Sequence, residues 1–175
     1  MTPHSDRTLR LVLLRHAKAA PGSGGPDELR ALTATGREQA AWVGASLAGA
    51  GLVPEVALVS AAVRTRETWQ HLGAALEPAP EEDVRDELYS AGVGTVLDVV
   101  REVDDRVRTV AVVGHEPTIS RTAAVLARED DDEALLDRVR HGVPTATYAV
   151  LELTTSWSRL DPGTARLVDV VTPPR

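Results

Sequence analysis

The sequence predicts an α/β fold of three layers, α/β/α, in which helices cover both faces of a mostly parallel central sheet. Three short apolar runs, at residues 9–14, 56–59 and 109–113, each precede a segment with helical features. Near-continuous hydrophobicity over so few residues is typical of strands that are buried on both faces. Alternation of such strands with helices indicates a parallel sheet, because parallel neighbours need a crossover connection.

The first predicted helix begins near Thr33 or Thr35 and ends at residues 49–51. Both threonines are candidate N-caps, and Thr35 stands three residues before Glu38, which is the spacing of a capping box. Apolar residues then recur at helical intervals. Three further helices are predicted at residues 62–76, 96–103 and 118–128.

The remaining segments predict a loop, a helix start and two outer strands. Residues 19–27 contain three glycines and two prolines, which predicts a loop. The acidic cluster 130–132 predicts the solvated start of a helix. Residues 145–153 and 166–171 alternate as strands do and are predicted to add edge strands. We expect one domain over residues 1–175, with residues 1–7 as a flexible tail.

Composition is that of a globular protein and excludes several functions. Of 175 residues, 43% are hydrophobic and 26% are charged, and the net charge is −7. This negative charge argues against general binding of nucleic acid, which needs a basic face. The absence of cysteine excludes disulfides and thiolate catalysis. No apolar run approaches the ~18 residues that a membrane span needs, so we expect a cytoplasmic protein without a membrane partner.

Charged and polar side chains follow all three predicted strands. Arg15 and His16 come directly after the first strand, residues 60–64 follow the second, and His115 follows the third. Ligands of open α/β sheets bind at the carboxyl ends of the strands. The sequence therefore predicts that these side chains meet in one site.

Three motifs resemble those of the histidine phosphatase superfamily in order and spacing. They are Leu13-Leu-Arg-His-Ala-Lys-Ala19, Ser60-Ala-Ala-Val-Arg-Thr-Arg-Glu-Thr68 and Val113-Gly-His-Glu-Pro117, with Ala17 where the family more often has glycine. The chain length and Asp86-Glu-Leu-Tyr89 most resemble the SixA-type phosphohistidine phosphatases. The resemblance covers roughly residues 9 to 130 and implies a phosphoglycerate mutase-like fold.

Phosphoryl transfer needs a nucleophile in line with the leaving group and cations around the equatorial oxygens. An imidazole can attack phosphorus and form a covalent intermediate, and we assign this role to His16. The guanidinium groups of Arg15 and Arg64 would grip phosphate oxygens and favour the neutral, attacking imidazole. His115 would donate a hydrogen bond to another oxygen.

Three other cations receive weaker assignments. Arg64 and Arg66 point about 200° apart if their segment is helical, so only one can face the pocket. The resemblance makes Arg64 the inward residue and leaves Arg66 on the surface. Lys18 and Arg30 are further candidates for substrate binding, although a role as exposed surface residues fits each equally well.

The general acid that would protonate a leaving group stays open at this point. Glu87, in the segment that resembles the family's acid-bearing segment, is the first candidate. Glu116 is the second, because another branch of the superfamily places its acid directly after the second histidine. An ordinary surface or capping role is an equal alternative for either carboxylate.

The sequence does not predict a metal site. Catalytic zinc takes three protein ligands, drawn from histidine and carboxylate. His4, His71 and His141 lack ligand spacing to their neighbours, and two arginines beside His16 and His115 would repel a dication. We therefore expect neither a metal nor a cofactor.

The predicted function is that of a metal-independent phosphatase that forms a phosphohistidine enzyme intermediate. Its partner would be a phosphorylated protein, carrying phosphohistidine, or a small phosphorylated molecule. Because no general acid is clearly assigned, a substrate with an N–P bond is favoured. Imidazole leaves readily once it is protonated, whereas an alkoxide leaving group needs an acid. Two alternatives are a mutase-like phosphotransferase and a non-catalytic phosphate-binding or phosphorelay-interaction module. The oligomeric state stays open.

Overall fold

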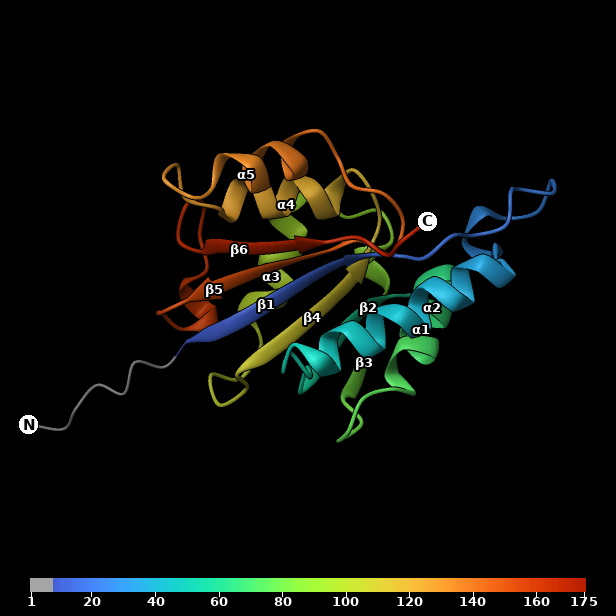
Figure 1. Cartoon of the computed structure of the whole chain (residues 1–175), viewed down its shortest axis with the longest axis horizontal. Helices are drawn as coiled ribbons and strands as arrows, with labels where there is room; N and C mark the ends of the chain where they lie inside the picture. The colour runs from blue at the N-terminus through green and yellow to red at the C-terminus, as the bar shows by residue number, and fades with distance from the viewer. Residues whose placement is uncertain (1–7) are drawn as a thin grey trace, which may run out of the picture.

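A computed structural model describes residues 8–175, and Figure 1 shows how their helices and strands are arranged. The predicted tail at residues 1–7 lies outside the described residues. A six-stranded sheet has the order β3-β2-β4-β1-β5-β6. Its strands are β1 (Leu9–Arg15), β2 (Val56–Ser60), β3 (Glu81–Arg85), β4 (Thr109–Gly114), β5 (Tyr148–Leu153) and β6 (Arg166–Val171).

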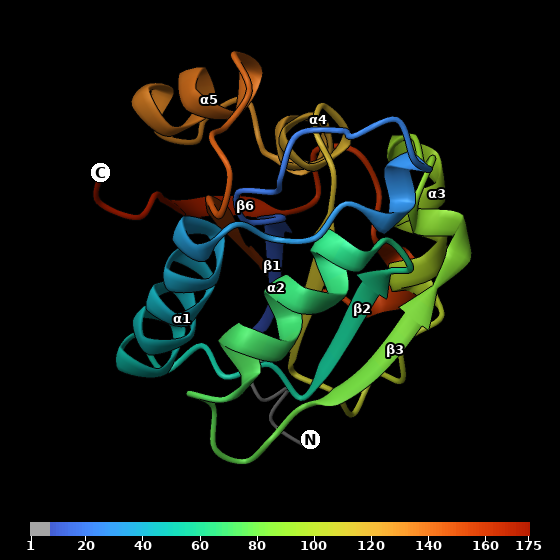
Figure 2. The ribbon, with the colours of Figure 1, turned by 90° about the vertical axis from the view of Figure 1, so that its right-hand side faces the viewer.

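Helices cover both faces of this sheet, as Figure 2 shows. Apolar residues of α1 (Ala34–Gly49) and α2 (Val63–Gly73) pack on one face. Those of α3 (Val93–Arg101), α4 (Thr118–Leu126) and α5 (Glu133–Arg140) pack on the other. Strands β3, β2, β4 and β1 are parallel to one another, and β5 is antiparallel to its neighbours β1 and β6. The predicted three-layer, mostly parallel fold is confirmed.

The central strand β1 explains why its sequence is apolar almost without interruption. Leu11 and Leu13 point into the cluster beneath α3, α4 and α5, whereas Val12 and Leu14 point into the cluster beneath α1 and α2. Each strand alternates its side chains between the two faces, so a strand covered on both sides needs apolar residues at every position. The buried strand β4 follows the same rule.

Two predictions about the sheet were wrong or incomplete. Residues 145–153 were expected at an edge, but β5 lies inside the sheet between β1 and β6, where five of its six residues are buried. The edges are β6 and β3. Strand β3 was not predicted because its sequence, Glu81 to Arg85, is mostly charged, which suits an exposed edge rather than a core.

The helix starts also differ in part from prediction. Thr33 is the N-cap of α1, because its Oγ1 accepts a hydrogen bond from the Gly36 amide at 3.0 Å. The capping box predicted from Thr35 and Glu38 is wrong, since Thr35 already lies inside the helix. The acidic cluster does start a helix: Asp132 caps α5 and accepts from the amides of residues 134 and 135.

The strand register brings three strand ends to the same level of the sheet. Arg15 at the end of β1 pairs with Gly114 at the end of β4, and Val59 near the end of β2 pairs with Val113. The amide of His16 continues this pairing, donating to the Gly114 carbonyl at 3.0 Å. Among residues 8–175, no helix is long and apolar enough to cross a membrane.

Candidate active site

His16 follows β1, and one of its ring nitrogens makes a hydrogen bond within the protein. Its Nδ1 lies 2.8 Å from the carbonyl oxygen of Ala17, and a carbonyl only accepts hydrogen bonds. The proton of the neutral ring is therefore on Nδ1, and Nε2 carries a lone pair. Burial, with the nearby cations Arg64 and Arg15, lowers the pKa of His16 to about 4. The ring is neutral at pH 7 and can act as a nucleophile.

His115 follows β4 and lies close to His16, with 5.4 Å between the ring centroids. Its Nε2 lies 2.8 Å from Oγ of Ser60, the buried last residue of β2. Burial and the nearby Arg64 lower the pKa of His115 to about 4, so this ring is also neutral at pH 7. When the Ser60 hydroxyl donates to Nε2, the single ring proton lies on Nδ1, which can then donate to a ligand.

The two arginines are anchored through their terminal nitrogens. Nη1 of Arg15 donates to the carbonyl oxygen of Val143 at 2.8 Å. Arg64, in the first turn of α2, is 6% exposed and donates from Nη1 and Nη2 to the backbone and side chain of Asp27, each at 2.9 Å. In both guanidinium groups Nε is buried and makes no hydrogen bond.

Three buried donors of this site lack a hydrogen-bond partner. Over residues 8–175, the only buried side-chain nitrogen or oxygen atoms without one are Nε of Arg15, Nε of Arg64 and Nδ1 of His115. Buried polar atoms are nearly always paired, because an unpaired one costs roughly 1–3 kcal/mol. That all three come from residues at separate strand ends indicates a place for an anion with several acceptor oxygens.

Asp27 is a site residue that the sequence did not reveal. It lies in a 3-10 turn, η1 (Asp27–Leu29), and its carboxylate accepts from Tyr89 Oη at 2.7 Å and from Arg64 and Arg30, each at 2.9 Å. These hydrogen bonds, with that of Tyr89 the largest influence, lower the pKa of Asp27 to about 2. The sequence does show an acid three residues before Arg30, a spacing that permits an ion pair. It gives no sign that this acid also contacts Arg64 on α2.

Among the other predicted cations, Arg30 pairs with a residue of the site, whereas Lys18 and Arg66 are exposed. Nε of Arg30 pairs with Asp27, and its charge helps to lower the pKa of His16. Lys18 is exposed; its amide donates to Gln39 and its carbonyl accepts from Thr33. Arg66 is exposed, as predicted.

The two candidate acids have other partners. Glu87 is exposed, and its carboxylate forms an ion pair with Arg85 at 3.2 Å. The carboxylate of Glu116 accepts from the amide and hydroxyl of Ser120 at 2.9 and 2.7 Å, and from the amide of Val143 at 3.2 Å. Glu116 therefore caps the start of α4, which is the ordinary role that the sequence left open.

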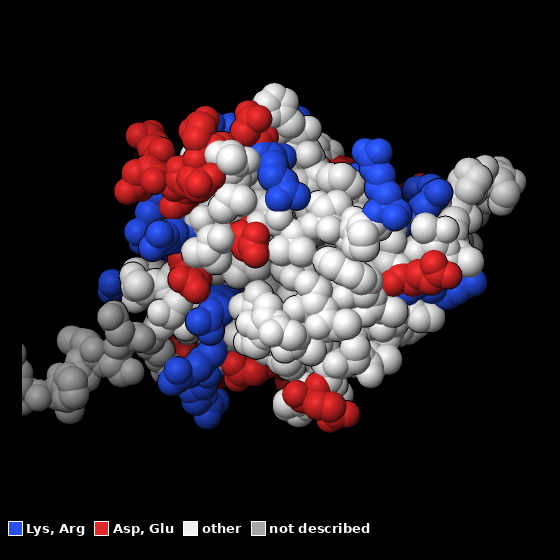
Figure 3. All heavy atoms as spheres, in the orientation of Figure 1, with Lys and Arg blue, Asp and Glu red and all other residues white. Residues whose placement is uncertain are grey.

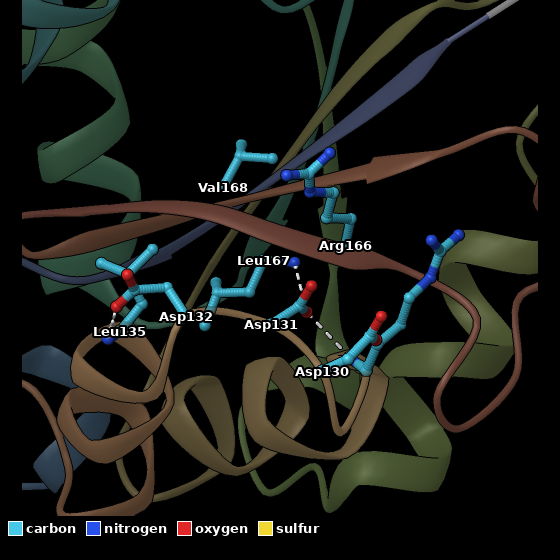
Figure 4. A pocket seen from close by; sticks show the side chains of 8 residues that line it. Asp130, Asp131, Asp132, Leu135, Arg166, Leu167 and Val168 are labelled. Atoms are coloured by element: carbon cyan, nitrogen blue, oxygen red, sulfur yellow. Dashed lines mark hydrogen bonds between the residues drawn. The ribbon is translucent and has the colours of Figure 1, made fainter.

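One cluster of acidic side chains lies away from this site. Figure 3 shows acidic side chains clustered where α5 begins, at the end of the molecule opposite the carboxyl ends of β1 and β4. A groove of about 470 Å³ lies there between α5 and β6 (Figure 4). Two of its acidic residues have structural partners: Asp131 accepts from the amides of Arg128 and Leu167, and Asp132 caps α5.

The described residues include no candidate metal site. Within residues 8–175, no cluster of three or more histidine, cysteine, aspartate or glutamate residues could hold a metal ion. The groups brought together at the site are the imidazoles of His16 and His115, the guanidinium groups of Arg15, Arg64 and Arg30, and the Asp27 carboxylate.

Comparison with known proteins decides the family. A SixA protein from Nakamurella multipartitia is 36% identical, has a TM-score of 0.83, and is matched over 96% of its length and 95% of this chain. The chain belongs to the SixA-type branch of the histidine phosphatase superfamily. The sequence profile of that superfamily (branch 1) matches residues 11–96. As a member, this histidine phosphatase is a hydrolase, and the predicted resemblance is confirmed.

Other relatives agree with this placement. A SixA protein from Agrobacterium tumefaciens is 31% identical with a TM-score of 0.78, over 94% of this histidine phosphatase and 98% of the relative. An uncharacterized protein of Mycobacterium tuberculosis (strain H37Rv) is 38% identical over 156 residues, which are 89% of this chain and 96% of the relative. The protein histidine phosphatase SixA solved with tungstate shares the fold, at 22% identity and a TM-score of 0.76 over 94% of this chain and 97% of that one.

Proposed function

We propose that this chain is a metal-independent phosphatase that carries the phosphoryl group of its substrate on Nε2 of His16. The observation that supports it best is the set of three unpaired buried donors beside an imidazole with a free lone pair. A phosphoryl group bound to Nε2 offers three equatorial oxygens, one for each donor: Nε of Arg15, Nε of Arg64 and Nδ1 of His115. These contacts would strengthen as negative charge develops in the transition state.

The first step forms one bond and breaks another. The lone pair on Nε2 of His16 attacks phosphorus, and the bond from phosphorus to the leaving group breaks with its electron pair on that group. The ring becomes positively charged, and the Ala17 carbonyl at Nδ1 stabilises that charge. Water then attacks phosphorus, the P–N bond breaks, the electron pair returns to Nε2, and both water hydrogens leave with the product as H₂PO₄⁻.

The contacts of the carboxylates favour a substrate with an N–P bond. Glu87 and Glu116 are engaged with Arg85 and with the start of α4, and Asp27 is ionised because its pKa is about 2. None of these carboxylates is placed to give a proton to an alkoxide. An imidazole protonated on its other nitrogen leaves without such help. We therefore propose phosphohistidine in a protein as the substrate, and the likeness to SixA proteins supports this choice.

Two predicted residues keep proposed roles at the rim of the site. Arg30 would add positive charge beside the phosphoryl group, since it already lowers the pKa of His16. Lys18, which is exposed and two residues after His16, would contact the part of the substrate that lies outside the pocket. A cytoplasmic location stays a prediction.

Release of free phosphate in the presence of a metal chelator tests this proposal. We expect the wild-type protein to hydrolyse a protein phosphohistidine at least tenfold faster, in kcat/KM, than an alkyl phosphate ester. The His16→Ala variant should release no phosphate from either. Hydrolysis by His16→Ala would reject the nucleophile, and transfer of the phosphoryl group to a second substrate in place of phosphate release would favour a mutase.

A further inference from the structure

Tyr89 contacts three groups of the site, although the proposed mechanism gives it no role. Its hydroxyl donates to Oδ2 of Asp27 at 2.7 Å. Its ring meets that of His115 edge-on, with 5.6 Å between centroids and 87° between planes. The guanidinium carbon of Arg64 lies 5.9 Å from the same ring centroid. Tyr89 follows the 3-10 turn η2 (Asp86–Leu88), which comes directly after β3.

We propose that Tyr89 is a positioning residue, whose hydroxyl holds Asp27 in the orientation that aims Nε of Arg64 at the phosphoryl group. This inference rests on the proposed function, because it assigns the purpose of the bond between Asp27 and Arg64. Tyr89 itself touches no reacting atom in this account.

Asp27 fixes the orientation of the Arg64 guanidinium. Its backbone oxygen accepts from Nη1 and its Oδ2 accepts from Nη2, so the group is held along one edge, and Nε is the nitrogen left without any partner. A guanidinium is planar, so a rotation of Asp27 would turn Nε away together with the other two nitrogens.

Tyr89 supplies an anchor for Asp27 from outside the loop that carries it. The Asp27 side chain is 52% exposed and lies next to the glycine-rich and proline-rich residues 19–26. One of its other partners, Arg30, belongs to the same loop, and the second, Arg64, is the residue to be oriented. The hydroxyl of Tyr89 is therefore the contact that ties Asp27 to the strand-end segment after β3.

Matched tyrosine variants separate this role from a general effect on the fold. Tyr89→Phe keeps the ring beside His115 and Arg64 but removes the hydroxyl. Tyr148→Phe removes the only other tyrosine hydroxyl of the chain, which lies 2.7 Å from Ser46 Oγ in the core. Competitive inhibition by orthovanadate, an analogue of the phosphoryl group, measures the affinity of the oxyanion site directly. KM and kcat are measured with the phosphohistidine protein as substrate.

We expect the inhibition constant of Tyr89→Phe to rise about tenfold and its kcat to fall about tenfold, with KM within about threefold, because the contact from Arg64 strengthens in the transition state. A factor of about ten is the effect of losing one hydrogen bond to a charged group. Tyr148→Phe should keep the wild-type inhibition constant. Asp27→Asn should raise this constant too, and the double variant with Tyr89→Phe should be no weaker than Asp27→Asn alone, because both changes act through Arg64.

Each other result overturns a stated part of the account. An unchanged inhibition constant in Tyr89→Phe, an equal rise in Tyr148→Phe, or effects of Asp27→Asn and Tyr89→Phe that multiply would each reject the role of Tyr89. In those cases the wild-type protein would still bind orthovanadate and release phosphate. A wild-type protein that does neither would reject the proposed function and this inference together.

Discussion

His16 and His115 each have one ring nitrogen occupied by the protein, but on opposite sides of the ring. The Ala17 carbonyl takes the Nδ1 proton of His16, and the Ser60 hydroxyl contacts Nε2 of His115. Nε2 of His16 is thereby left with a lone pair, and when the Ser60 hydroxyl donates to Nε2 of His115, the proton of that ring lies on Nδ1. At the scale of single residues, these two contacts distinguish the imidazole that attacks from the one that donates in the proposed mechanism.

Ser60→Ala tests the assignment of the proton on His115. Without the hydroxyl, the proton of the neutral ring can lie on either nitrogen, and Nε2 loses its partner. We expect kcat/KM for phosphate release to fall about tenfold, the effect of losing one hydrogen bond of this kind. Ser46→Ala, which removes a hydroxyl bonded to Tyr148 elsewhere, serves as the control and should stay within twofold. An equal loss in both variants would contradict the assignment.

The protonation of His16 gives a prediction about pH. Its pKa is lowered to about 4, whereas an unfolded histidine titrates near 6.5. The unfolded state therefore binds more protons between these values, so this residue favours unfolding progressively as pH falls from about 6.5 towards 4. An NMR titration of the imidazole C–H signals, with His16→Gln used for assignment, should give a midpoint near 4. A midpoint near 6.5 would show that the ring is not buried beside the arginines.

At the scale of elements, the loop after β1 is tied to two helices of the same face. The amide of Ala17 donates to Thr68 Oγ1 on α2 at 2.9 Å, and the carbonyl of Lys18 accepts from the amide and hydroxyl of Thr33 at the start of α1. Gly36 lets α1 approach this carbonyl, since a Cβ there would lie 2.1 Å from the oxygen. The position of His16, the proposed nucleophile, thus depends on helix packing.

Gly36→Ala is expected to disturb that packing. Something must shift to make room for the methyl group, and overpacking of this kind typically costs about 1–3 kcal/mol of unfolding free energy. Gly49→Ala, at the other end of the same helix, places its Cβ in open space and should leave stability unchanged or raise it slightly. Urea denaturation measures both. Equal stability of the two variants would mean that α1 does not pack closely against the loop.

For the whole molecule, the buried strands follow from patterns that are local in the sequence, whereas other parts of the sheet depend on pairing. The apolar runs that form β1, β2 and β4 predict buried strands because both faces of the sheet are covered. Glu81 to Arg85 carries no such run, since β3 lies at an edge, and only its pairing with β2 makes it a strand. The inner place of β5 depends on its pairing with β1, which periodicity cannot reveal.

The site divides in the same way. Arg15, His16, Arg64 and His115 are predictable because each lies at or just beyond a strand end, and parallel strands bring those ends together. Asp27 and Tyr89 are not, because their hydrogen bond joins residues 62 positions apart. In the segment after β3 the sequence favoured Glu87, but Glu87 pairs with Arg85 and Tyr89 contacts His115.

The most direct test of the central claim is to find the phosphoryl group on the enzyme. Wild-type protein mixed with a phosphohistidine protein and quenched in alkali should carry one phosphoryl group, which mass spectrometry of its peptides places on His16. The Ser60→Ala protein should carry it on the same residue. A phosphoryl group on any other residue, or none during active turnover, would contradict the account.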